Sequence, residues 1–140
     1  MNWTIAQSLN DMVEYPIPND VRQFILESID SIAQLEALIL LRGSPDEEWG
    51  AQKVAGRLYI GEQEANSLLA RLSAEGLIAF NNDKPPLYRY QPDSDDLALM
   101  VDRLAETYSK HLVPVTNLVH SKPRTRVREF ADAFTLRKDE

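Results

Sequence analysis

Apolar residues recur at helical spacing in two segments near the start of the chain. Residues 3–14 carry four of them on one predicted helical face, namely Ile5, Leu9, Met12 and Val13. Pro16 ends this segment, because proline and the residue before it disfavour helical backbone. A second helix is predicted to begin with Asp20 as its N-cap, and Val21, Phe24 and Ile25 follow helical spacing along it.

The next segment, from Ser31 to Gly43, is richly apolar. Ser31 and Gln34 have the spacing of a capping box, in which two side chains satisfy free amides at a helix N-terminus. The apolar residues cover more than one face of the predicted helix, namely Ile32, Leu35, Leu38, Ile39 and Leu41. Gly43 and Pro45 end it. We therefore expect this helix to lie at the centre of the fold.

From Gln52 to Ile78 the apolar positions fit two short helices joined at a corner. The first helix buries Val54, Ala55 and Leu58, and Ile60 fills the corner. The buried face of the second helix consists of Ala65, Leu68, Leu69 and Leu72. Gly61 is predicted to relieve the turn and to act as N-cap, with Glu64 in the capping-box position. Gly76 is predicted to close the second helix in a left-handed conformation.

Two short strands are predicted after the corner. Residues 77–80 and 87–90 are rich in strand formers, and the polar residues 81–84 with two prolines form the turn between them. Two helices and a hairpin make a winged helix-turn-helix. Trp49 is expected at the base of its core. The acidic run 46–48 is interpreted as favourable charge before a helix N-terminus rather than as a metal site.

A long helix is predicted after the hairpin, over residues 95–113. Its apolar residues keep helical spacing, namely Leu97, Met100, Val101, Leu104, Tyr108 and Leu112. Pro114 is predicted to kink or end this helix, and Val115, Leu118 and Val119 continue the apolar pattern beyond it. A small winged helix cannot cover this much apolar surface alone, so the pattern favours a homodimer.

The segment from Val54 to Ile78 resembles the helix-turn-helix and wing entry of bacterial winged-helix regulators, the MarR type and the ArsR type among them. The resemblance spans residues 31–92 and implies a mainly helical fold with a small β-hairpin wing. A helical extension, 1–30, precedes this unit, and C-terminal helices, 93–140, follow it and are expected to serve dimerisation or partner binding. Tyr59 departs from the pattern, since many such proteins have glycine there.

The resemblance also implies that the second helix of the corner lies in the major groove of DNA, with its N-terminal residues at base edges. Gln63, Asn66, Ser67 and Arg71 are then expected to face the groove, and the wing residues Lys84 and Arg89 to contact phosphates. The alternative is that this polar helix face is simply solvated.

The charge distribution argues against strong DNA binding by one protomer. The chain has a net charge of −7, and residues 1–100 hold seven Lys or Arg against sixteen Asp or Glu. An acidic body repels phosphates at long range, so binding must come from a local basic patch or from a dimer that concentrates one. A winged-helix adaptor that binds a protein instead of DNA is therefore the alternative function.

The C-terminal segment is the most basic part of the chain. Lys122, Arg124, Arg126 and Arg128 form a cluster, and Phe130 and Phe134 follow on one helical face. Four alternatives stay open: the segment contacts nucleic acid, pairs with the acidic body, binds a protein partner through its arginines and phenylalanines, or packs back on its own domain.

Nothing in the sequence indicates an enzyme. The chain has no cysteine, no glycine-rich phosphate loop, and no zinc-binding histidine motif, and neither His111 nor His120 has a partner at the spacing of a known catalytic site. We therefore expect no catalytic residue, metal or cofactor. No apolar run reaches the length of a membrane span, and the N-terminus lacks the features of a secretory signal, so a cytoplasmic protein without membrane contact is expected.

Overall fold

The computed structural model describes residues 16–122. Four helices come first along this part of the chain, namely α2 (Asn19–Ser28), α3 (Ile32–Gly43), α4 (Ala51–Leu58) and α5 (Glu62–Ala74). The strands β1 (Ile78–Phe80) and β2 (Tyr88–Tyr90) follow, then α6 (Asp95–Lys110) and a further helical segment, 112–122. The helix predicted over residues 3–14 and the basic segment 123–140 lie outside the described residues.

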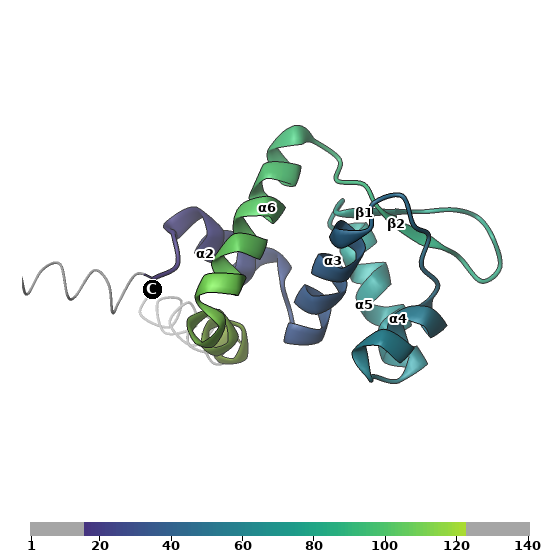
Figure 1. Ribbon diagram of the computed structural model, residues 1–140, viewed down its shortest axis with the longest axis horizontal. Coiled ribbons are helices and arrows are strands. Elements are labelled where there is room, and N and C mark those ends of the chain that lie inside the picture. Colours follow the sequence, from purple (N-terminus) through teal and green to yellow (C-terminus); the bar gives the residue numbers. More distant parts are fainter. Residues whose placement is uncertain (1–15, 123–140) are drawn as a thin grey trace, which may run out of the picture.

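Helix α3 lies between two groups of elements (Figure 1). On one side are α2, α6 and the segment 112–122; on the other are α4, α5 and the wing. Helix α3 contacts α4, α5 and β2, and α2 packs against α6. Leu35, Leu38 and Leu41 of α3 are completely buried. The prediction that this apolar helix is central is confirmed.

The start of α2 differs from the prediction, whereas the start of α3 agrees with it in part. Pro18, not Asp20, is the N-cap of α2, and Asp20 lies in the first turn, where its Oδ1 accepts a hydrogen bond from Val21 N. Ser31 caps α3 as predicted, since its Oγ accepts a 3.1 Å hydrogen bond from Gln34 N. The second half of the capping box is shifted by one residue, because Gln34 Oε1 accepts from Asp30 N at 2.7 Å.

The corner between α4 and α5 has the predicted apolar contacts but a different turn. Val54 and Ala55 of α4 are buried, and Ile60 packs against the same core. The left-handed residue is Tyr59, at φ 58°, whereas Gly61 is the N-cap of α5 in extended backbone. The prediction that Gly61 relieves the turn was therefore wrong. Ile60 N donates to Ala55 O, and this hydrogen bond closes α4. The backbone turns away from the helix axis at Tyr59, the left-handed C-cap residue.

Gly76 ends α5 as predicted, at φ 76°. Gly76 N donates to Ser73 O and Leu77 N donates to Leu72 O, so the last carbonyls of the helix are satisfied in a Schellman arrangement. A Cβ at this position would collide with the carboxylate of Asp93, whose backbone N–H donates to Gly76 O at 2.9 Å. The chain after the wing is therefore held against the end of α5.

The wing is an antiparallel pair of three-residue strands. Ile78 lies opposite Tyr90, and Phe80 lies opposite Tyr88. Trp49 extends the pair on the other side of β2, because its backbone exchanges two hydrogen bonds with Tyr88, of 2.7 and 2.8 Å. Trp49 is 1% exposed, so the prediction that it belongs to the core is confirmed.

The C-terminal helices break at a different residue from the one predicted. Ser94 is the N-cap of α6, with its Oγ accepting from Leu97 N, and His111 is the C-cap. Pro114 does not break the helix. It lies in the first turn of the segment 112–122, where backbone N–H groups have no acceptor within the helix, so the missing N–H of proline removes no hydrogen bond. Val115, Leu118 and Val119 are buried beyond it.

Candidate nucleic-acid interface

Helix α5 has an apolar face and a polar face. Ala65, Leu69 and Leu72 are completely buried and Leu68 is 7% exposed, so the buried face is the one that the periodicity predicts. Gln63, Asn66 and Ser67 are exposed on the opposite side. The three side chains carry amide or hydroxyl groups and no charge. This strip can donate and accept hydrogen bonds, which is the chemistry of base-edge contacts in a major groove.

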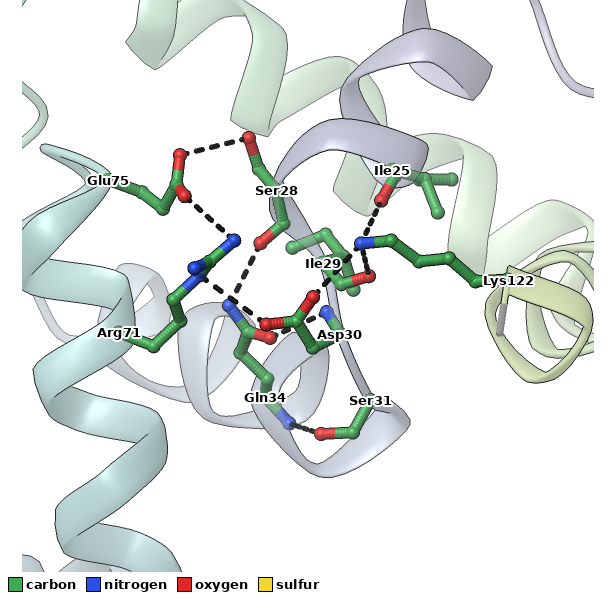
Figure 2. Close-up of polar contacts among 9 residues, drawn as sticks. All are labelled: Ile25, Ser28, Ile29, Asp30, Ser31, Gln34, Arg71, Glu75 and Lys122. Atoms are coloured by element: carbon green, nitrogen blue, oxygen red, sulfur yellow. Dashed lines mark hydrogen bonds and ion pairs between the residues drawn. The ribbon is translucent and has the colours of Figure 1, made fainter. Parts of the chain in front are cut away.

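Arg71 is placed differently from the other three residues predicted to face the groove. Its Nη2 lies 3.0 Å from Glu75 Oε1, and its Nε lies 3.4 Å from Asp30 Oδ2 in the segment between α2 and α3 (Figure 2). The guanidinium therefore lies on the flank of α5 that faces α2. Two carboxylates compete there with any phosphate for its charge, whereas Gln63, Asn66 and Ser67 are uncharged.

The wing carries two cations of the candidate interface. Lys84 lies in the turn between the strands and Arg89 lies on β2, and both are exposed. Neither makes an ion pair with a residue in the range 16–122. Their charges are therefore available to a phosphate backbone, in contrast to that of Arg71.

Two further cations lie on α4 against Trp49. The Nζ of Lys53 lies 4.2 Å from the centre of the Trp49 ring, and the guanidinium of Arg57 lies 5.5 Å from it. Lys53 also forms an ion pair with Glu47. The tryptophan ring orients both side chains at the surface. Residue spacing places both cations on one helix, but their contact with Trp49 depends on the pairing of the Trp49 backbone with Tyr88 of β2.

A groove of about 540 Å³ lies between the outward side of α5 and the wing. Its apolar walls are formed by Ala70 and Ala74 of α5 and by Phe80, Pro86 and Tyr88 of the wing. Lys84 and Asp83 lie at the same groove with opposite charges. The side chain of Phe80 is 59% exposed here. The sequence analysis did not predict this groove, because strand and helix patterns do not show how far the wing stands from α5.

The described residues thus bring together Gln63, Asn66 and Ser67 on α5 and leave Lys84 and Arg89 unpaired on the wing. The residues predicted to bind a partner lie outside this part of the chain: Arg124, Arg126, Arg128, Phe130 and Phe134. Within residues 16–122 no group of His, Asp or Glu side chains is arranged to hold a metal ion. No helix in the same range is long and apolar enough to span a bilayer.

The fold is similar to that of bacterial transcriptional regulators of known structure. A MarR family transcriptional regulator from Streptomyces coelicolor matches with a TM-score of 0.52 and 19% identity, over 99% of this chain and 94% of its own. Heme-free PefR matches with a TM-score of 0.52 and 19% identity, over 100% of both chains. No protein-family model and no curated protein matches the sequence.

At this level of identity the likeness concerns the fold alone. The chain has the winged helix-turn-helix fold that the MarR family regulator has, mainly helical and with a two-stranded wing. The fold class predicted from residues 31–92 is therefore confirmed. In this chain the second helix of the corner is α5.

Proposed function

We propose that this protein is a DNA-binding transcriptional regulator that acts as a homodimer in the cytoplasm and catalyses no reaction. One observation carries the proposal: the exposed face of α5 presents Gln63, Asn66 and Ser67 on the same winged-helix unit whose wing holds two exposed cations. These cations, Lys84 and Arg89, form no ion pair among residues 16–122. Base edges require hydrogen-bonding side chains on the recognition helix, and phosphates require cations beside it. The regulator named above has the same fold.

The charges of α5 and its surroundings make the proposed affinity weak and sensitive to salt. Glu62 and Glu64 in the first turn of α5 oppose phosphate approach, and Arg71 is paired with carboxylates. Each phosphate contact contributes a slope of about −0.9 to log K against log salt concentration. A protomer that uses the two wing cations and the two α4 cations therefore has a slope of about −3.6, which a dimer doubles.

The proposed dimer uses helices outside the winged-helix unit. Leu99 of α6 is 60% exposed, and Leu112 and Val113 in the first turn of the segment 112–122 are 55% and 64% exposed. Large apolar side chains at the surface favour contact with a second copy. Sedimentation of the full chain at micromolar concentration tests this part of the proposal. A monomer there contradicts the dimer, whatever the protein does with DNA.

The DNA-binding part is tested by titrating labelled genomic fragments at about 50 mM and about 200 mM salt. Asn66→Ala is expected to reduce the preference among fragments, because it removes a base contact. Replacing Lys84 and Arg89 together by alanine is expected to weaken binding to all fragments and to flatten the salt dependence. Arg22→Ala is the matched control, since Arg22 is an exposed cation on α2, away from the wing.

The outcomes separate the regulator from other functions. If no fragment binds wild-type protein at the lower salt concentration, the DNA-binding proposal is wrong. If Arg22→Ala weakens binding as much as the wing variant does, the contact is a general attraction to positive charge and does not involve the winged-helix face.

The apolar groove between α5 and the wing supports a second candidate function, that of an adaptor that binds a protein. A groove formed by Ala70, Ala74 and Phe80 suits the apolar face of an amphipathic helix better than a phosphate backbone. Phe80→Ser separates the two functions. A regulator that contacts phosphates through Lys84 and Arg89 keeps most of its DNA affinity in this variant, whereas an adaptor loses its partner. The basic and aromatic residues predicted at 124–134 would then extend the partner surface.

A further inference from the structure

Lys122 is an almost fully buried cation at the end of the described chain. Its side chain is 4% exposed, and its Nζ donates to Ile29 O at 2.7 Å and to Ile25 O at 3.3 Å (Figure 2). Those carbonyls belong to the C-terminal end of α2, where a cation is favoured by the helix dipole. Lys122 therefore joins the segment 112–122 to the end of α2. For this one residue of the predicted basic cluster, the contacts agree with two of the four alternatives, pairing with an acidic side chain and packing on its own domain.

Asp30 extends this contact to α5. Its Oδ1 accepts a 3.0 Å hydrogen bond from Lys122 Nζ, and its Oδ2 lies 3.4 Å from Arg71 Nε. Arg71 also pairs with Glu75, whose Oε2 accepts from Ser28 Oγ at 3.2 Å. One carboxylate thus lies between two cations from helices far apart in the sequence, as Figure 2 shows. The two cations and the two carboxylates of this cluster balance in charge.

The contacts of this cluster restrict how α5 can rotate about its own axis. Arg71 lies on the flank of the helix, between its buried face and the exposed strip of Gln63, Asn66 and Ser67. Rotation of α5 about its axis would separate Arg71 from Asp30. The segment 28–30, held by Lys122 on one side and by Arg71 on the other, therefore limits that rotation.

We propose that Asp30 is a positioning residue that couples the segment 112–122 to the recognition helix α5 through Lys122 and Arg71. A change in how the C-terminal segment packs, such as assembly with a second copy, alters the direction in which α5 presents its polar face. The consequence for DNA rests on the proposed function. The coupling itself does not depend on it, because it concerns contacts within one chain.

Amide hydrogen exchange of the full chain without DNA tests the coupling directly. Lys122→Met removes the charge and keeps the buried stem. We expect it to raise exchange at the C-terminal half of α5 by about fivefold or more relative to the centre of α3. Coupling is reciprocal, so Arg71→Gln is expected to raise exchange in the segment 112–122 by a similar factor. Arg71 is 41% exposed, so this second variant keeps the test available if Lys122→Met does not fold.

Arg42→Gln is the matched control. Arg42 makes a comparable ion pair between distant elements, at 2.9 Å from Asp102 Oδ1, and is 34% exposed, but its partner lies on α6 and not on α5 or the segment 112–122. We expect it to leave exchange in α5 unchanged relative to α3. The proposal is overturned if the cluster variants raise exchange by the same factor in every helix, or if Lys122→Met changes only α2 and the segment 112–122.

DNA titration of the same variants separates this proposal from the proposed function. If wild-type protein binds a fragment, Arg71→Gln is expected to weaken binding to the preferred fragment more than to others, with an unchanged salt slope, because no phosphate contact is lost. A reduced slope would make Arg71 a phosphate contact and contradict the positioning role. If wild-type protein binds no fragment, the proposed function fails while the exchange result still decides the coupling.

Discussion

The helix-turn-helix corner and the contacts of α3 with its flanking helices hold the molecule together in different ways. The corner is apolar: Val54 of α4 and Ala65, Leu69 and Leu72 of α5 are completely buried. The flanking contacts add charged and polar pairs between distant residues, such as Tyr108 with Glu36, Arg42 with Asp102, and Lys122 with Asp30.

This difference has a physical consequence. Apolar burial is non-directional and tolerates small shifts, whereas a hydrogen bond to a charged group requires defined distances and angles. Both regions bury apolar side chains, since Ile25, Val101 and Leu104 on the flanking side are also completely buried, so apolar burial supplies most of the stability. The charged pairs of the flanking contacts fix how the winged-helix unit is oriented against α6 and the segment 112–122. The following substitutions test this comparison.

The largest loss is expected at the corner. Leu68→Ala should lower the free energy of unfolding by about 2 to 5 kcal/mol, because it removes a nearly buried side chain and leaves a cavity. Ser67→Ala, on the exposed side of the same helix, is the control and should change it by less than about 0.5 kcal/mol. Urea unfolding measures both. Similar values for the two variants would mean that α5 does not bury the face described above.

A smaller loss is expected at the flanking contacts. The hydroxyl of Tyr108 on α6 donates to Glu36 Oε1 on α3 at 2.7 Å. Tyr108→Phe keeps the ring and removes this bond, so unfolding at neutral pH should become easier by about 1 to 2 kcal/mol. A loss as large as that of Leu68→Ala would contradict the view that apolar burial supplies most of the stability.

The same pair predicts a dependence on alkaline pH. Burial, and then the hydrogen bond and charge of Glu36, raise the pKa of Tyr108 to about 12 from its ordinary value of 10.0. The folded state therefore holds the phenol proton more tightly than the unfolded state does. This contribution is complete below the unfolded pKa and is lost as pH rises towards the folded pKa. The stability difference between wild type and Tyr108→Phe should shrink over that range, as urea unfolding at several pH values will show.

The N-cap of α3 tests a polar contact of shorter range. Ser31→Ala removes the acceptor for Gln34 N and should cost about 1 kcal/mol. Ser31→Asp keeps an acceptor at the same place and should restore most of the loss. If both variants lose the same stability, the serine acts through its packing and not as a cap. Thermal unfolding is sufficient to compare them.

The smallest effect is expected at the half-exposed pair of Arg42 and Asp102. Arg42→Gln should change the free energy of unfolding by about 0.2 to 1 kcal/mol, because solvent screens the charges. The effect should diminish in about 1 M salt. A larger effect that persists in salt would show that the flanking contacts stabilise the molecule as strongly as the corner does.

Local spacing was sufficient to predict the elements and the apolar face of α5. A helix repeats its faces at a period of 3.6 residues, so the positions of Leu68, Leu69 and Leu72 identify the buried side without reference to the rest of the chain. Gly76 was also predictable from the local sequence, because the left-handed position after a helix favours glycine. The winged-helix fold and the exposure of Gln63, Asn66 and Ser67 follow from these local patterns.

Only the tertiary structure decided where the charged side chains lie. The sequence places Arg71 on a polar helix and Lys122 in a basic cluster, but their common partner is Asp30, which is 92 residues away from Lys122. A long cation can reach several carboxylates, and local spacing does not distinguish among them. Likewise, the left-handed residue of the turn is Tyr59 and not Gly61. The hydrogen bond from Ile60 N to Ala55 O closes α4, so the backbone changes direction at Tyr59. Apolar burial follows from local period, whereas ion pairing depends on which distant segments the fold brings together.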